Sequence, residues 1–235
     1  YQHIDADGLN KLHQYAEAWS YYLIKASVDL AKEKGPCTKW KETKYGQGLF
    51  PIDTYKRDVD ELAKPEYALQ WRLLADEVAS HGIRNSTLMA LMPSETSAQI
   101  SNATNGIEPP RSLVSVKQSK DGVLKQVVPE IRKLRKKYDL LWDQESPEGY
   151  LKIVAVLQKF IDQGISVNTS YNPKFYEDEK IPMSEMLKHL LMFYKYGGKQ
   201  LYYFNTFDGA GEIEIKQPEL EAGKIDDEDC EACKI

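Results

Sequence analysis

The chain has 235 residues, of which 42% are hydrophobic and 29% charged, and its formal net charge is −5. This composition is ordinary for a globular protein, and three cysteines are too few for a disulfide-rich secreted scaffold. No apolar run approaches the roughly 20 residues of a membrane span, and the first residues lack a signal-peptide pattern, so we expect a cytoplasmic protein that does not enter a membrane.

The first half of the chain is expected to be mainly helical. Apolar residues at three- and four-residue spacing predict a long amphipathic helix over residues 7–34, which Gly35-Pro36 ends. Shorter helices are expected over about 54–64 and 67–80, with Gly82 ending the second. The apolar segment "STLMALMP" then predicts a buried strand, and "SETSAQISNA" the start of another helix.

The second half mixes both element types. Two short strands flank Asp121-Gly122, a strong hairpin signal. Helices over about 129–143 and 147–163 precede a polar loop over 168–182, and a last helix over about 183–196 precedes the strand "KQLYYFNT". The chain is thus a helix-rich α/β protein with too few visible strands to close a barrel by itself.

The C-terminal end is strongly acidic. From residue 219 to residue 235, seven acidic residues minus two lysines give a net charge of −5, so the rest of the chain is balanced. A balanced body disfavours nucleic-acid binding, and the acidic segment is expected to be a flexible arm. A solvated terminus without a role is the alternative.

The segment "PSETS", residues 93–97, follows the predicted strand directly. Free backbone N–H groups and hydroxyls at a helix start can bind phosphate. Thr96 and Gln99 also fit a capping box, which needs no ligand. Spacing alone leaves both interpretations open.

Two adjacent tyrosines, Tyr202 and Tyr203, lie in the last predicted strand. Neighbours in a strand should point to opposite faces. The pair Tyr21-Tyr22, in the first helix, is read as packing only, and the pattern alone gives the later pair the same interpretation.

Cys230 and Cys233 lie on the acidic arm, two residues apart. The four histidines are not spaced as ligand pairs, so a structural zinc site is not expected, and we predict no metal site in the chain. A thioredoxin-type fold is disfavoured because its cysteine pair sits between a strand and a helix. Disulfide exchange with another protein remains.

Three segments in order, "RNSTLMALMPSETSAQISNATNGIEPPRS", "QLYYFNT" and "CEACKI", resemble the C-terminal part of the large, catalytic subunit of class I ribonucleotide reductase. The likeness covers essentially the whole chain. It implies that residues 1–207 are the C-terminal portion of a ten-stranded α/β barrel, completed by a missing N-terminal portion or partner chain. Residues 208–235 would be a flexible acidic redox tail.

The resemblance also implies an activity, the reduction of ribonucleoside diphosphates to deoxyribonucleoside diphosphates by radical chemistry. Tyr202 and Tyr203 match tyrosines that transfer the radical, and Cys230 and Cys233 match a redox-active pair that thioredoxin or glutaredoxin reduces. The segment that matches the substrate phosphate site is made of Pro93, Ser94, Glu95, Thr96 and Ser97. The chain itself would bind no cofactor, since the metal-radical cofactor belongs to the small subunit.

The sequence departs from the family pattern in two respects. Bacterial tail cysteines are usually separated by four residues instead of two, which leaves the reductant of this pair open. Counterparts of the radical cysteine and the active-site redox pair are missing, because Cys37 lies where the family has no catalytic thiol. The chain should therefore be inactive without the N-terminal piece of the subunit, and a two-piece enzyme, or a piece of one, is expected.

Two other classes remain as alternatives. One is a non-catalytic helical interaction module whose CxxC arm docks a redox partner. The other is a thioredoxin-like reductase that would reduce ordinary protein disulfides by itself.

Overall fold

The computed structural model describes residues 5–208 except 65, 95, 105, 120 and 121, with backbone only for 96, 99, 116–119 and 122–124. The helices are α1 (Ala6–Lys34), α2 (Pro51–Thr54), α3 (Trp71–His81), α4 (Thr96–Ile100), α5 (Ile131–Leu134), α6 (Glu148–Gln158) and α7 (Met183–Lys195). The strands are β1 (Val114–Ser119), β2 (Gly122–Val127), β3 (Val167–Tyr171) and β4 (Leu201–Thr206). Short 3₁₀ helices connect several of them.

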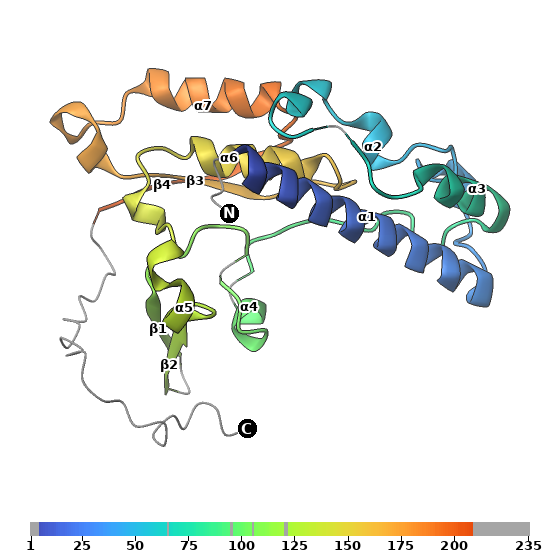
Figure 1. Cartoon of the computed structure of the whole chain (residues 1–235), viewed down its shortest axis with the longest axis horizontal. Coiled ribbons are helices and arrows are strands. Elements are labelled where there is room, and N and C mark those ends of the chain that lie inside the picture. The colour runs from blue at the N-terminus through green and yellow to red at the C-terminus, as the bar shows by residue number, and fades with distance from the viewer. Residues whose placement is uncertain (1–4, 65, 95, 105, 120–121, 209–235) are drawn as a thin grey trace.

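The long first helix is confirmed. The carboxylate of Asp5 accepts a hydrogen bond from the Gly8 N–H at its start, and Gly35, with φ of 77°, ends it. A positive φ is costly for residues with a Cβ, so glycine suits this end. One face of α1 packs against α3 and α6, and α6 packs against α7 on its other side, so α6 is the central helix (Figure 1).

Glu17 is a buried carboxylate that shapes the chain before α3. It accepts hydrogen bonds from the backbone N–H groups of Ala68 and Leu69 and from the indole N–H of Trp71. Since the side chain is only 1% exposed, these donors replace its lost water. They also hold residues 68 and 69 outside a helix, which is why the helix expected from 67 begins at Trp71.

The hairpin prediction is confirmed. β1 and β2 pair antiparallel, and Ser119 lies opposite Gly122. Together with α5 the hairpin projects from the main body (Figure 1).

A second group of extended segments is parallel. β3 pairs with β4, and Leu91 makes an isolated parallel bridge with Ile165, just before β3. The Leu91 N–H donates to the Gly164 carbonyl, and the Ser166 N–H donates to the Leu91 carbonyl. The buried strand expected over 86–93 is therefore present only as this single bridge, and of these residues only Met89 is buried.

Other predicted elements are wrong in part. The helix expected over 54–64 is replaced by α2 and the 3₁₀ helix Arg57–Glu61, because Tyr55 is extended between them. The helix expected over 129–143 is likewise interrupted by the extended Tyr138. The polar loop expected from 168 begins with β3 instead.

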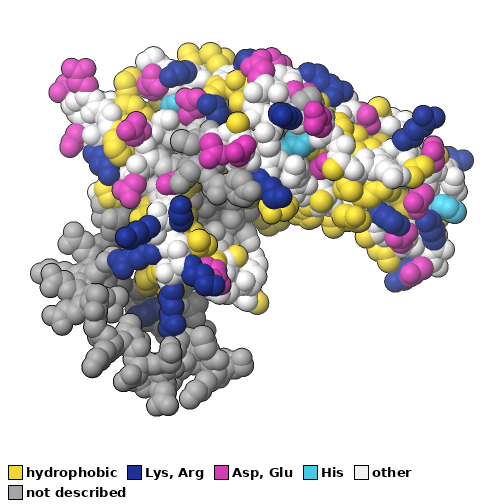
Figure 2. All heavy atoms as spheres, in the orientation of Figure 1, with side chains coloured by type: hydrophobic (Ala, Val, Ile, Leu, Met, Phe, Trp, Pro, Cys, Tyr) yellow, Lys and Arg dark blue, Asp and Glu magenta, His cyan; other side chains and the backbone are white. Residues whose placement is uncertain are grey.

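The open faces of two helices carry large apolar side chains. On α1, Tyr15, Trp19 and Tyr22 are exposed, and apolar side chains are visible on the surface of the molecule (Figure 2). On α7 the exposed apolar residues are Met183, Leu187, Leu190, Leu191 and Tyr194. Among the described residues, no helix combines the length and apolar character needed to cross a bilayer.

Candidate functional site

The tyrosine pair lies on an irregular part of β4. Val167 is paired with Leu201 and Thr169 with Phe204, so two steps along β3 match three steps along β4. β4 therefore carries one extra residue, a β-bulge, at Tyr202 and Tyr203.

This bulge overturns the expectation that the two tyrosines point to opposite faces. Their ring centroids are 4.2 Å apart, and the hydroxyl of Tyr203 donates to that of Tyr202 over 3.4 Å. This hydrogen bond raises the pKa of the Tyr203 phenol above its ordinary value. Both side chains are more than half exposed, so the contact does not result from core packing.

The earlier pair behaves differently. The rings of Tyr21 and Tyr22 are 5.3 Å apart and nearly perpendicular. Tyr21 also packs edge-on against Trp71, as expected for a packing residue, whereas Tyr22 is 58% exposed and only its partner reaches the core. Of these two pairs, both within the described part of the chain, only the one on β4 has a hydrogen bond between its hydroxyls.

Side chains of β3 hold the main chain of the bulge. The Tyr203 N–H donates to Asn168 Oδ1 over 3.2 Å. The Thr169 hydroxyl donates to the Tyr203 carbonyl oxygen over 3.4 Å. Asn168 Nδ2 in turn donates to Glu108 Oε1 over 2.6 Å.

The hydroxyl-rich segment after Leu91 is described in part. Pro93 is exposed, and the hydroxyl oxygens of Ser94 and Ser97 lie 2.6 Å apart. Glu95 is outside the described residues, and Thr96 begins α4 with its side chain outside them. The capping box of Thr96 and Gln99 therefore stays a prediction.

A short loop links this segment to the tyrosine pair. Gly106, with φ of 57°, lies so close to Ser94 that a Cβ at this position would be 3.6 Å from the Ser94 nitrogen. Two residues later, Glu108 binds Asn168, which binds Tyr203. The structure thus brings two of the predicted sites together through residues 106–108, which were not predicted to be part of either site.

The predicted cysteine site can be followed only in part. Cys230 and Cys233 lie outside the described residues. Cys37 is partly buried, and its N–H donates to the Ile83 carbonyl. In the sequence, Cys37 lies far from both the 93–97 segment and the tyrosine pair. This placement agrees with a structural cysteine.

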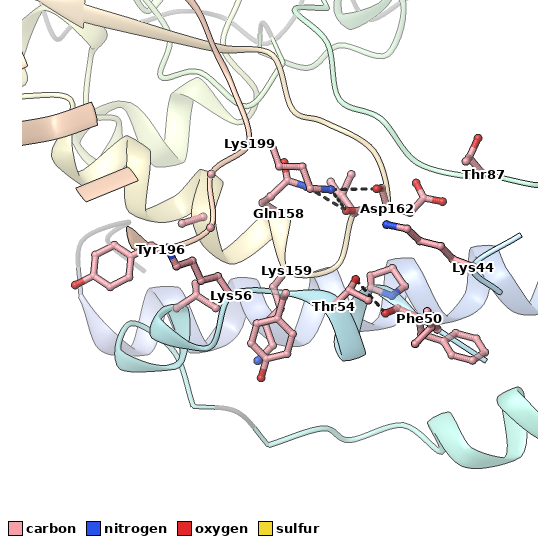
Figure 3. Close-up of a pocket in the computed structure, with 18 of the residues that line it drawn as sticks. Lys44, Phe50, Thr54, Lys56, Thr87, Gln158, Lys159, Asp162, Tyr196 and Lys199 are labelled. Atoms are coloured by element: carbon pink, nitrogen blue, oxygen red, sulfur yellow. Dashed lines mark hydrogen bonds between the residues drawn. The ribbon is translucent and has the colours of Figure 1, made fainter. Parts of the chain in front are cut away.

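A separate pocket of about 820 Å³ lies between α2, the end of α6 and the residues after α7, and no predicted site residue lines it (Figure 3). Two of its lysines make contacts within the chain. Lys159 pairs with Asp60 over 2.7 Å, and Lys199 donates to the carbonyls of residues 161–163, just after α6. Burial lowers the pKa of Lys199 from its ordinary value.

Within the described ranges, no group of three or more histidine, cysteine, aspartate or glutamate side chains is arranged to hold a metal ion.

Comparison with known proteins gives one consistent family. The model of the family described as "Ribonucleotide reductase, barrel domain" matches residues 1–204. The chain is 53% identical over 233 residues to ribonucleoside-diphosphate reductase 1 subunit alpha of Escherichia coli (strain K12). It is 54% identical over 231 residues to the subunit alpha of Haemophilus influenzae and 45% identical over 233 residues to that of Enterobacteria phage T4. Each match covers 98% of this chain but only 30% of the relative's length.

Proposed function

Because the chain belongs to the ribonucleotide reductase family, we propose that it is a C-terminal piece of a catalytic subunit that reduces ribonucleoside diphosphates to deoxyribonucleoside diphosphates. The observation that carries this proposal is the contact between the phenols of Tyr202 and Tyr203 on the bulge of β4. The family membership gives this contact its chemical meaning.

Tyr202 and Tyr203 act as radical-transfer residues in this proposal. A tyrosine with an ordinary pKa of about 10 must lose its proton as it loses its electron, so a second phenol in contact is a suitable partner. The exposure of both rings supports the proposal, because a radical that arrives from another subunit needs an accessible first acceptor.

The segment from Pro93 to Ser97 binds the substrate phosphates. The neighbouring hydroxyls of Ser94 and Ser97 provide donors, and Glu95 and Thr96 lie between these two residues in the sequence. Hydroxyl donors to a charged phosphate are stronger than those between neutral groups. The loop of residues 106–108 supports a single site, because it contacts both this segment and Asn168.

Cys230 and Cys233 form the dithiol that returns electrons to the active site and is itself reduced by thioredoxin or glutaredoxin. Exchange of this kind requires a thiolate that can reach a disulfide sulfur. An acidic arm that carries a CxxC pair as its only thiols suits such a carrier.

The activity belongs to a complex. The N-terminal portion of the large subunit supplies the radical cysteine and completes a ten-stranded α/β barrel, and the small subunit supplies the metal-radical cofactor. The open apolar faces of α1 and α7 support this view, because exposed patches of this kind mark surfaces that another chain covers.

Reconstitution tests the proposal. The chain is mixed with the remaining portion of the large subunit and with the small subunit, and formation of deoxyribonucleoside diphosphate is measured. Turnover is expected only in the complete mixture. Turnover by this chain with the small subunit alone, or an assembled but inactive complete mixture, would overturn it, and the second outcome would favour the non-catalytic interaction module.

A further inference from the structure

The bulge on β4 takes Tyr203 out of the regular ladder with β3. Both of its main-chain groups are nevertheless bound, and in both cases by side chains of β3. Asn168 Oδ1 accepts from the Tyr203 N–H, and the fully buried Thr169 hydroxyl is oriented towards the Tyr203 carbonyl. A bulge leaves such groups without ladder partners, so these side chains replace the missing hydrogen bonds.

Glu108 decides which way the Asn168 amide points. A carboxylate can only accept hydrogen bonds, so the Asn168 amino group must face Glu108 Oε1, 2.6 Å away. The amide oxygen then faces the Tyr203 N–H. The two hydrogen bonds therefore run in one direction: Tyr203 donates to Asn168, and Asn168 donates to Glu108.

The contact between the two phenols depends on the bulge. Without the extra residue, Tyr202 and Tyr203 would lie on opposite faces of the strand. With it, their rings touch on one side.

We infer that Asn168 is a positioning residue that holds the bulge and thereby keeps the phenols of Tyr202 and Tyr203 in contact. The effect of Asn168 on turnover rests on the proposed radical transfer, whereas its effect on the contact between the phenols does not. Another side-chain link between the same strands, from Asn205 Nδ2 to Ser170 Oγ over 3.5 Å, lies beyond the bulge and provides the comparison.

The phenol contact is measured by placing 3-fluorotyrosine at position 203 of the full chain and following its fluorine resonance during a pH titration. The Tyr202→Phe variant shows the titration of a phenol without its partner. Asn168→Ala is expected to shift the titration at position 203 down to the same midpoint. Ser170→Ala is expected to leave it unchanged. An unshifted titration in a folded Asn168→Ala protein, as judged by circular dichroism, overturns the inference.

A second pair of variants tests the direction of these hydrogen bonds and does not require that the Asn168→Ala variant folds. Asn168→Asp keeps an acceptor for the Tyr203 N–H but places a carboxylate against that of Glu108, so the upward shift at position 203 should be lost. Adding Glu108→Gln supplies an amino group that can donate to the new carboxylate, and the shift should return. If the double variant stays like Asn168→Asp, or if Asn168→Asp alone keeps the wild-type titration, the inference is wrong.

Turnover in the reconstituted complex separates this inference from the proposed function. A loss on the order of a hundredfold, typical of an ångström-scale misplacement, is expected for Asn168→Asp, with recovery in the double variant. A changed titration with unchanged turnover would leave the positioning role intact and contradict radical transfer through the pair. An unchanged titration would contradict only the positioning role.

Discussion

The hydroxyl oxygens of Tyr202 and Tyr203 lie 3.4 Å apart, although the two residues are neighbours in one strand. Regular strand geometry would separate them to opposite faces. The extra residue of β4 therefore creates the contact on which the proposed radical transfer depends.

Replacing either tyrosine by phenylalanine tests that role. Tyr202→Phe and Tyr203→Phe keep the ring but remove the oxidisable hydroxyl, so turnover of the reconstituted enzyme should fall at least about 10³-fold, or about 4 kcal/mol of barrier. Assembly, substrate binding and thermal stability should stay close to those of the wild type.

The matched control is the pair on α1. Tyr21→Phe and Tyr22→Phe remove the same atom from a pair whose nearly perpendicular rings have no hydrogen bond between their hydroxyls in the described structure, so turnover should be retained. Equal behaviour of all four variants would show that the hydroxyls on β4 have no special role.

Removing hydroxyls near α4 should weaken substrate binding. Thr96→Val together with Ser97→Ala is expected to lower kcat/KM by about 10²- to 10⁴-fold, since each of the two hydrogen bonds to a charged group contributes about 1.5–3 kcal/mol. Ser101→Ala, just after the same short helix, is the control, because its hydroxyl donates to the carbonyls of Ser97 and Ala98. Normal kinetics in a destabilised Thr96/Ser97 double variant would show that this segment has a structural role and does not bind the substrate.

The cysteine pair should matter for repeated turnover only. Cys230→Ser with Cys233→Ser is expected to stop thioredoxin- or glutaredoxin-driven cycles while a pre-reduced complex completes its first turnover. Single-turnover and steady-state rates measure the two effects, and Cys37→Ser should alter neither. Full steady-state rates in the double variant would exclude the pair as the electron carrier.

His13 should make the fold sensitive to acid. Burial, with a smaller effect of Lys159, lowers the pKa of this histidine from 6.5 to about 4. Below pH 6.5 the unfolded state therefore binds more protons, and the free energy of unfolding should fall as the pH drops towards 4, by at most about 3 kcal/mol from this residue.

Urea unfolding at several pH values measures that slope. His13→Phe should flatten it, although His189, whose pKa burial also lowers, keeps part of the slope in the same direction. His81→Phe, at an exposed position of α3, should keep the wild-type slope. An equal slope in His13→Phe and wild type would show that His13 does not titrate differently on unfolding.

Helices with a strong periodic pattern and clear end signals could be predicted from the sequence. α1 and α7 begin and end within a few residues of their expected limits, because Asp5, Gly35 and Gly197 act locally. α3 could not be placed as well, because its start depends on the distant Glu17.

β3 was missed although its signal was present. Val167, Thr169 and Tyr171 are buried and alternate with Asn168 and Ser170, which is the two-residue period of a strand. The polar residues Asn168, Thr169 and Ser170 are instead typical of a loop, although Thr169 is buried. The bulge of β4 was beyond prediction, because it is defined only by the register between β3 and β4.

The parallel arrangement also determines how late the tyrosine site can form during folding. Residues 163–171 have their neighbours at Leu91 on one side and at β4 on the other, so every pairing closes a long loop before it gains a hydrogen bond. β4 is synthesised after all the other described elements. Until it pairs, β3 presents an open edge that favours association with other chains, so slower synthesis of the segment before β4 should increase aggregation of the newly made protein.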